Sequence, residues 1–189
     1  MWELIKMKKI LGLVILMAGL LISVTASSAN FAYFHADRNV HIQIVPDDNE
    51  LIDLEPLQPY AYISDNGMLV VDLSHNNVNW EEGFGEGVSP NSTYVFEEVF
   101  GVSNHLWEET PICMNITYSG SGGILFFEGD YVSGTTVGAT NLYVTVQPGE
   151  VVKIGMIINS TDMDAGTSLN GNLGFYATAG VCGAPQGPQ

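Results

Sequence analysis

The 189-residue chain carries 21 acidic side chains against five Lys and Arg, which gives a formal net charge of −16. A protein with this few cations cannot displace the counterions of a nucleic acid, and the charge therefore excludes a nucleic-acid partner. Because 46% of the residues are hydrophobic, the acidity does not indicate disorder, and the length is sufficient for one domain with its own core.

The first 29 residues have the pattern of a secretory signal peptide. Three lysines (6, 8 and 9) precede an apolar run over residues 10–22, and small residues fill positions 23–29. This order predicts cleavage after Ala26 or Ala29 and an extracellular, cell-surface location. The apolar run is shorter than the ~18–20 residues that cross a bilayer. An uncleaved membrane anchor and a pilin-type leader remain the alternatives, and the leader is the only expected membrane contact.

The remainder of the chain alternates apolar and polar residues with a period of two, which predicts an all-β protein. Clear alternation covers residues 39–45, 68–73, 112–118, 141–147 and 151–158, and weaker candidates are 60–63, 93–100, 124–128 and 173–178. About nine short strands separated by Gly-rich turns favour an antiparallel, jelly-roll-like β-sandwich. We expect a single domain over residues 30–182 and a disordered tail over 183–189.

Local signals add three expectations to this pattern. Asp65-Asn66-Gly67 predicts a hairpin turn, and residues 147–150 predict a tight turn between two clear strands. Residues 48–54 carry the only helical hint, which ends at Pro56. The adjacent acids Glu97 and Glu98 interrupt an apolar strand, which indicates a β-bulge or a sheet edge that keeps both carboxylates in water.

Two cysteines, Cys113 and Cys182, remain in a chain that is expected to be exported, so the simplest expectation is a disulfide between them. The alternation over residues 112–118 turns Cys113 away from the core, where it could hold the end of the last strand. A loop of this length would stabilise the fold by roughly 4 kcal/mol. Free thiols or intermolecular links are the alternatives, and two cysteines are too few for a zinc site.

Three sequons make Asn91, Asn115 and Asn159 candidate glycosylation sites. Asn91 and Asn159 lie where strands meet loops. Asn115 is predicted to point outward, beside Cys113.

No combination of residues indicates catalysis, and we expect a protein that is not an enzyme. The four histidines, at positions 35, 41, 75 and 105, share no ligand spacing. Asp162, Asp164 and Gly166 resemble the start of a calcium loop, but the third acid and the distal Glu are absent. Acids also cluster over residues 47–55. We therefore expect no cofactor, with calcium as a weak alternative.

Three segments carry a resemblance: residues 36–40, residues 87–96 with Val99, Phe100 and Asn104, and residues 146–152. They resemble an archaeal family of exported β-sandwich proteins of undefined function, which is similar to the TasA and camelysin group of secreted proteins. The TasA-like resemblance implies assembly, in which each subunit passes its N-terminal strand into its neighbour. The matching strand here would be residues 30–36, with Phe31, Tyr33 and Phe34 available to fill a groove. Packing of this segment on its own domain is the alternative.

The sequence leaves three hypotheses from different classes, of which the third, a secreted hydrolase, would need carboxylates that converge in a cleft. The first is a structural subunit of a cell-surface filament or envelope-associated layer, with copies of itself or other surface subunits as partners. The second is a monomeric surface module that binds calcium or glycan.

Overall fold

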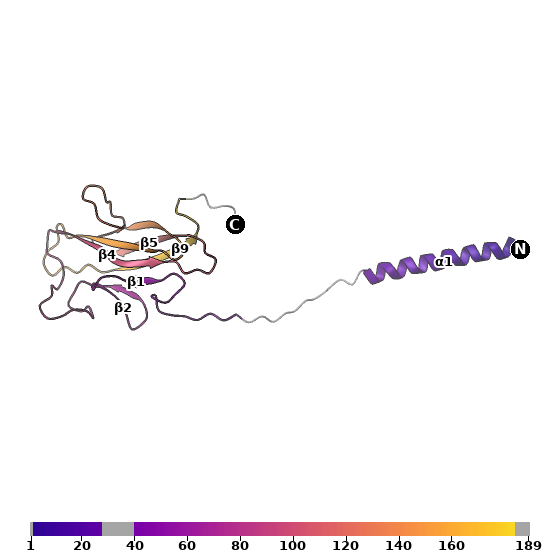
Figure 1. The fold of residues 1–189 in the computed structure, drawn as a ribbon, viewed down its shortest axis with the longest axis horizontal. Coiled ribbons are helices and arrows are strands. Elements are labelled where there is room, and N and C mark those ends of the chain that lie inside the picture. Colours follow the sequence, from indigo (N-terminus) through magenta and orange to yellow (C-terminus); the bar gives the residue numbers. More distant parts are fainter. Residues whose placement is uncertain (1, 28–39, 184–189) are drawn as a thin grey trace. The chain divides into compact units, whose positions relative to one another are not determined.

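The computed structural model describes residues 2–27 and 40–183, and the chain divides into two compact units, Met1–Ile42 and Gln43–Gln189 (Figure 1). In the described part of the first unit the chain forms one helix, α1 (Trp2–Ser27). Good helix formers such as Leu, Met and Ala dominate this segment, and no proline interrupts it. Over residues 2–27 and 40–183, no helix is long and apolar enough to cross a membrane.

The second unit contains nine strands within its described residues. They are β1 (Leu54–Pro56), β2 (Ala61–Ile63), β3 (Leu69–Val71), β4 (Thr93–Ser103), β5 (Ile112–Gly120), β6 (Gly123–Glu128), β7 (Asn141–Val146), β8 (Val151–Asn159) and β9 (Gly171–Ala179). They form a four-stranded sheet in the order β1-β4-β8-β6, a three-stranded sheet in the order β7-β5-β9, and a β2–β3 hairpin. Every pairing is antiparallel.

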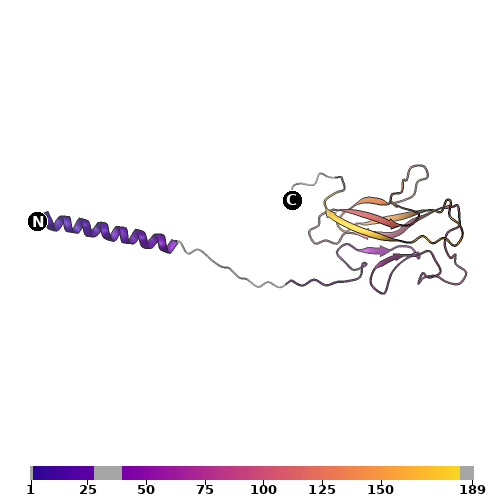
Figure 2. The same cartoon turned by 180° about the vertical axis from the view of Figure 1, so that it is seen from behind.

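From β4 to β9, each strand lies in the opposite sheet from the strand before it. Connections that cross between two packed sheets characterise the jelly roll, so the expected all-β, antiparallel sandwich is confirmed. Figure 2 shows β9, in yellow, unobstructed in the view from behind.

The core lies between the two sheets and consists of the residues that the alternation predicted to point inward. Ile112, Met114 and Ile116 of β5 are buried, as are alternate residues of β7 and β8. Phe100 of β4 meets Phe175 of β9 across the sandwich, with ring centroids 5.9 Å apart. Each such edge-to-face pair contributes about 1 kcal/mol beyond the area that it buries.

The expected β-bulge is present in β4. The register with β8 shifts between Phe96 and Phe100, and Glu98 adopts a positive φ of 51°. Both carboxylates find partners at the surface: Glu97 accepts a 2.8 Å bond from the backbone N–H of Tyr131, and Glu98 pairs with Lys153. The bulge therefore keeps two adjacent charges out of the core.

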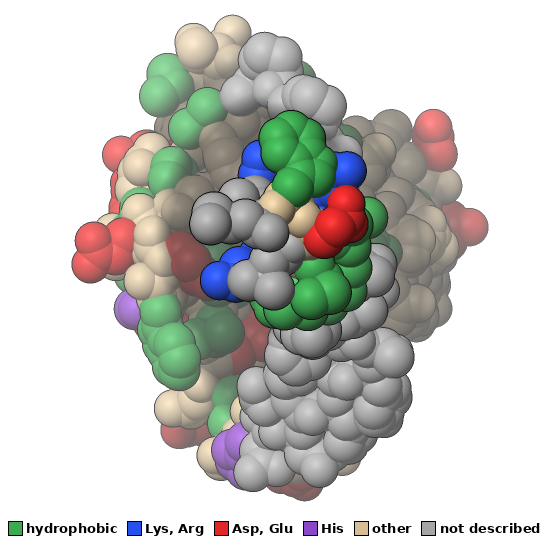
Figure 3. Space-filling model, turned by 90° about the vertical axis from the view of Figure 1, so that its right-hand side faces the viewer, with side chains coloured by type: hydrophobic (Ala, Val, Ile, Leu, Met, Phe, Trp, Pro, Cys, Tyr) green, Lys and Arg blue, Asp and Glu red, His purple; other side chains and the backbone are tan. Residues whose placement is uncertain are grey.

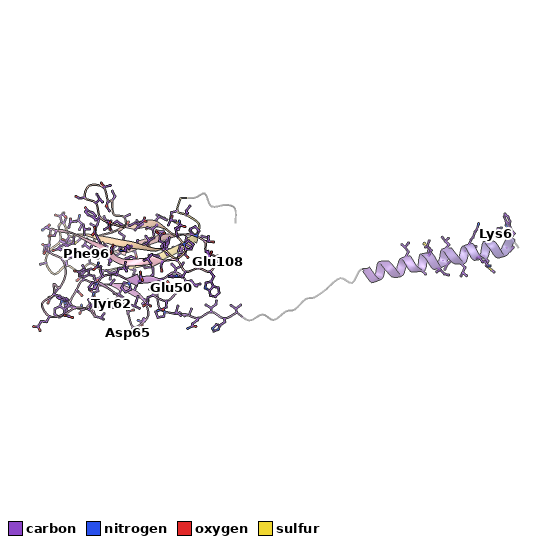
Figure 4. The ribbon with its side chains drawn as sticks, in the orientation of Figure 1. Lys6, Glu50, Tyr62, Asp65, Phe96 and Glu108 are labelled. Atoms are coloured by element: carbon purple, nitrogen blue, oxygen red, sulfur yellow. A yellow bond between two sulfur atoms is a disulfide. The ribbon has the colours of Figure 1, made fainter. Side chains whose placement is uncertain are left out.

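Both expected turns form. Gly67 takes a φ of 79° in the turn between β2 and β3, and Figure 4 marks Asp65 there and Tyr62 on β2. At residues 147–150 the N–H of Glu150 donates to the carbonyl of Gln147, at 3.1 Å. This second turn carries the chain from β7 to β8, which belong to different sheets.

Two sequence-based expectations are wrong. The described part of the strand expected over residues 39–45 is neither strand nor helix, because a strand needs a neighbour for its backbone groups and no described strand pairs with it. Residues 48–54, which carried the helical hint, form turns and bends that lead into β1 and contain no helix. There the Asp47 carboxylate accepts a 2.8 Å bond from the N–H of Leu69, so it serves the hairpin instead of a helix.

Candidate interaction surfaces

β9 forms one side of the three-stranded sheet, and its outer side pairs with no strand in the described structure. The N–H of Gly180 donates to the carbonyl of Pro111, and the N–H of Ser121 donates to that of Asn170. Gly180 and Asn170 therefore belong to the hydrogen-bonded pairs of this antiparallel ladder. Since such pairs alternate along a strand, the even-numbered residues of β9 turn their backbone groups toward β5. The backbone groups of Leu173, Phe175 and Ala177 consequently point to the open side. We call this side the open β9 edge.

Natural edge strands are usually protected by a charge, a proline, a bulge or a very short length. β9 has nine residues, of sequence GNLGFYATA, and its pairing with β5 runs without a register shift. It contains no charged residue and no proline, in a chain with 21 acids. The open β9 edge is therefore an unprotected template for another strand.

Residues 40–44 keep the alternation that a strand would use. Val40, Ile42 and Ile44 are 83%, 76% and 90% exposed. Such a row of exposed apolar side chains indicates a surface that another chain covers. The proposed assembly residues Phe31, Tyr33 and Phe34 precede this row and lie outside the described residues, as does the tail at 184–189.

The disulfide between Cys113 and Cys182 is present, as expected, with 4.7 Å between the Cα atoms. It joins the central strand β5 to the segment that follows β9. The N–H of Cys182 also donates to the Thr145 hydroxyl of β7, at 3.0 Å. The segment 180–182 thus crosses the outer face of the three-stranded sheet and is held to two of its strands.

Two of the three sequons lie at the same end of the four-stranded sheet. Thr93 of the first sequon pairs with Asn159 in the register of β4 and β8. Asn91 and Asn159 are both exposed, and the Asn91 side-chain oxygen accepts a 2.9 Å bond from the N–H of Asp162. Both side chains are exposed at this end of the sandwich, and their glycosylation stays a prediction.

Asn115 lies on the outward face of β5, as the alternation predicts. Its Nδ2 donates to the hydroxyl of Tyr143, at 3.3 Å, and its Oδ1 is buried with no partner among the described residues. The third sequon is thus half-buried and already engaged with a neighbouring side chain.

The calcium-loop residues lie beside a small hollow. Asp164 lines it with Ser89 and Ser160, and its volume of about 50 Å³ would hold only a few water molecules. Asp162 takes a positive φ of 61° in the same loop. Within residues 2–27 and 40–183, no three His, Cys, Asp or Glu side chains gather as a metal site would require.

The acids over residues 47–55 surround the start of β1. Burial, followed by the charges of Asp47 and Asp53, raises the pKa of Glu50 above its usual value. The Oδ2 atom of Asp53 lies 3.3 Å from Nε2 of His105, the one histidine that the structure places against an acid in its described part. Figure 3 shows acidic side chains, in red, at several separate places on the face it presents.

Two exposed side chains received no role in the sequence analysis. Tyr143 and Tyr176 are 60% and 63% exposed, and both lie opposite Asn115 in the register of the three-stranded sheet. Alternation alone turns them outward, because Leu142, Val144 and Phe175 turn inward. What the alternation could not reveal is that β7 and β9 flank the same strand.

The fold and the disulfide define the class of protein: a disulfide-linked antiparallel β-sandwich. Within that class, residues 44–182 match the family described as a protein of unknown function (DUF1102), and the chain belongs to this family. The match begins one residue after the start of the second compact unit and ends at Cys182. A search of curated proteins finds no match.

Proposed function

We propose that the protein is an exported cell-surface structural protein, the subunit of a filament or envelope-associated assembly joined by exchange of N-terminal strands. In this proposal it binds copies of itself and catalyses no reaction. The single observation that carries the proposal is the open β9 edge, which offers unpaired backbone groups over a full-length strand.

The donor in this proposal is the segment that leads into the sandwich. Phe31, Tyr33 and Phe34 begin it, and the exposed row of Val40, Ile42 and Ile44 ends it. A donor strand gains backbone hydrogen bonds from the sheet edge, while every second side chain packs onto the receiving subunit. Residues 40–44, which pair with no strand in the described chain, would pair with a strand of a neighbouring subunit.

The leader and the disulfide support the location. A basic, apolar and small-residue front end is typical of exported proteins, and stable disulfides are typical of oxidising compartments outside the cytoplasm. The resemblance to TasA-like proteins supports assembly in the same way. The excess of acids suppresses non-specific association, so that contact between subunits would depend on a specific strand.

Negative-stain electron microscopy of the full chain at high concentration tests the proposal. We expect fibres or bundles, which Ile42→Asp abolishes because a charge enters the apolar row of the donor. Gln43→Asp, on the other face of the same segment, is the matched control and should still assemble. Ala177→Pro should also block assembly, because it removes an N–H from the open edge and leaves the pairing with β5 intact.

A chain that stays monomeric under all conditions would overturn the proposal. So would assembly that survives both Ile42→Asp and deletion of residues 30–36.

A further inference from the structure

The outward side chains of β7, β5 and β9 form one face of the three-stranded sheet, which we call the tyrosine face and which the segment after β9 crosses at its Cys113 end. Its residues are Asn141, Tyr143 and Thr145 of β7, Cys113, Asn115, Thr117 and Ser119 of β5, and Asn172, Gly174, Tyr176 and Thr178 of β9. None of these side chains carries a charge, although residues 30–189 contain 20 acids. Hydroxyl, amide and phenol groups make up nearly all of the surface.

Each tyrosine of this face contacts a neighbouring residue of the sheet. A Cβ atom placed on Gly174 would lie 3.0 Å from Cε2 and 3.4 Å from the hydroxyl oxygen of Tyr176. The Tyr176 ring therefore occupies the space that a side chain at Gly174 would fill. The hydroxyl of Tyr143 accepts the hydrogen bond from Asn115 of β5. Both side chains nevertheless stay largely exposed, at 60% and 63%.

The separation of the two tyrosine residues along the backbone of the sheet follows from the register. Tyr143 and Tyr176 are both direct partners of Asn115, so exactly one strand lies between them. Two strand spacings place the two residues roughly 10 Å apart across the sheet. In an extended β-1,4-linked hexopyranose chain, alternate sugar rings present the same face at about this repeat.

We propose that the tyrosine face binds a neutral, extended polysaccharide, with Tyr143 and Tyr176 stacked on alternate pyranose rings. The C–H face of a pyranose is apolar and weakly positive, which complements the negative face of a tyrosine ring. Asn115 lies between the two tyrosines in the register, and Thr117 follows it on the same face of β5, where its hydroxyl oxygen can accept a hydrogen bond from the intervening sugar. The site is distinct from the open β9 edge and does not depend on assembly.

The charge of the protein selects the class of polysaccharide. An anionic polymer would be repelled by the net charge of −16, and a cationic polymer would find no carboxylate on the face. A neutral chain meets neither obstacle. A glycan attached to Nδ2 of Asn115 would occupy the same surface, so modification of Asn115 and binding of a polysaccharide exclude one another.

Isothermal titration calorimetry of the full chain tests the proposal, with Asn115 verified as unmodified by mass and with a detergent that has no sugar headgroup. The probes are the neutral β-1,4-linked hexamers cellohexaose, mannohexaose and hexa-N-acetylchitohexaose. We expect at least one to bind with a Kd below the millimolar range. The corresponding disaccharide, which cannot reach both rings, should bind at least tenfold more weakly, and the charged hexagalacturonate should not bind.

Variants of the two tyrosines then locate the site. Tyr143→Val and Tyr176→Val remove the rings but keep residues that favour strands, and each should weaken binding at least fivefold. Tyr143→Phe and Tyr176→Phe keep the rings and should bind nearly as tightly as the unmodified chain. Trp107→Ala is the control, because Trp107 is 89% exposed and lies in the loop between β4 and β5, outside the tyrosine face.

Failure of all three hexamers to bind would overturn the proposal. Binding that both valine variants leave unchanged would overturn it too, as would binding that Trp107→Ala abolishes. If a valine variant loses the cooperative thermal transition, the phenylalanine variants and the disaccharide comparison decide the outcome.

Discussion

Lys153 of β8 donates a 2.8 Å hydrogen bond to the carboxylate of Glu98, the residue that bulges out of β4. Lys153 is the last of the five Lys and Arg in the chain, and no other Lys or Arg follows Arg38. The hydrogen bond to Glu98 raises the pKa of Lys153 above its usual value. The single cation of the sandwich thus lies at the place where two adjacent acids interrupt a strand.

The backbone at this bulge gives a first prediction. Glu98 has a φ of 51°, a conformation that β-branched residues avoid. Glu98→Val should destabilise the domain by about 1–2 kcal/mol more than Glu98→Gly, because both lose the contact with Lys153 and only valine strains the backbone. Urea unfolding followed by tryptophan fluorescence measures the difference. Equal stability of the two variants would contradict it.

The disulfide gives a second prediction. Cys113 and Cys182 are 69 residues apart in the sequence, and closing a loop of that length restricts the unfolded chain. The double variant Cys113→Ser/Cys182→Ser should therefore lose roughly 4 kcal/mol of unfolding free energy. Dithiothreitol should lower the thermal midpoint of the unmodified chain toward that of the double variant. The double variant itself should not respond to the reductant.

A third prediction concerns the contact between Gly155 and Phe127, which pair between β8 and β6. A Cβ at Gly155 would run into the buried ring of Phe127. Gly155→Ala should cost about 1–3 kcal/mol through overpacking. Gly85→Ala is the control, because nothing lies within 4 Å of a Cβ there, and it should cause no loss.

The same contact predicts coupling between the two positions. If overpacking is the cause, Gly155→Ala should cost much less in a Phe127→Ala background than alone. Chemical denaturation of the four proteins in this cycle measures the coupling. Additive effects would show that the alanine acts on the β8 backbone and not on the ring.

The fourth prediction follows from Glu50. Because the pKa of Glu50 is raised in the folded state, a charged Glu50 lowers the free energy of unfolding at pH values above this folded-state pKa. That loss disappears as the pH falls through the folded pKa toward the usual value of 4.5, since the folded state takes up the proton first. Glu50→Gln should thus stabilise the domain at pH 7 by about 0.5 kcal/mol or less, since the site is exposed.

The advantage of Glu50→Gln should shrink as the pH approaches 4.5, which thermal unfolding across a pH series measures. Glu86→Gln, on an exposed loop, removes the same charge away from Asp47 and Asp53 and should give a smaller gain. An equal gain from the two variants would mean that net charge, and not the local cluster, determines the effect.

Much of the sandwich could be predicted because its central strands follow simple alternation. In β5, β7 and β8 one face is buried and the other wet, so the period of two identifies both the strand and its inward residues. The disulfide could be predicted because the chain has two cysteines and alternation turns Cys113 outward.

The errors occur where pairing, not local pattern, decides the structure. Residues 40–45 alternate as well as β8 does, but the described chain offers them no partner. β1 has three residues and includes Pro56, too short for a periodic signal, and it exists because Leu54 pairs with Val102 of β4. The tyrosine face was missed for the same reason, since strand order brings Tyr143 and Tyr176 to either side of Asn115.

The position of β8 in the sheet also constrains when the protein can fold. β4 and β6 both depend on β8 for their main pairing, and β8 is the second-last strand along the chain. During synthesis, the four-stranded sheet cannot close until residues 151–159 have been added. The sandwich therefore condenses late in synthesis, through long-range contacts that form slowly.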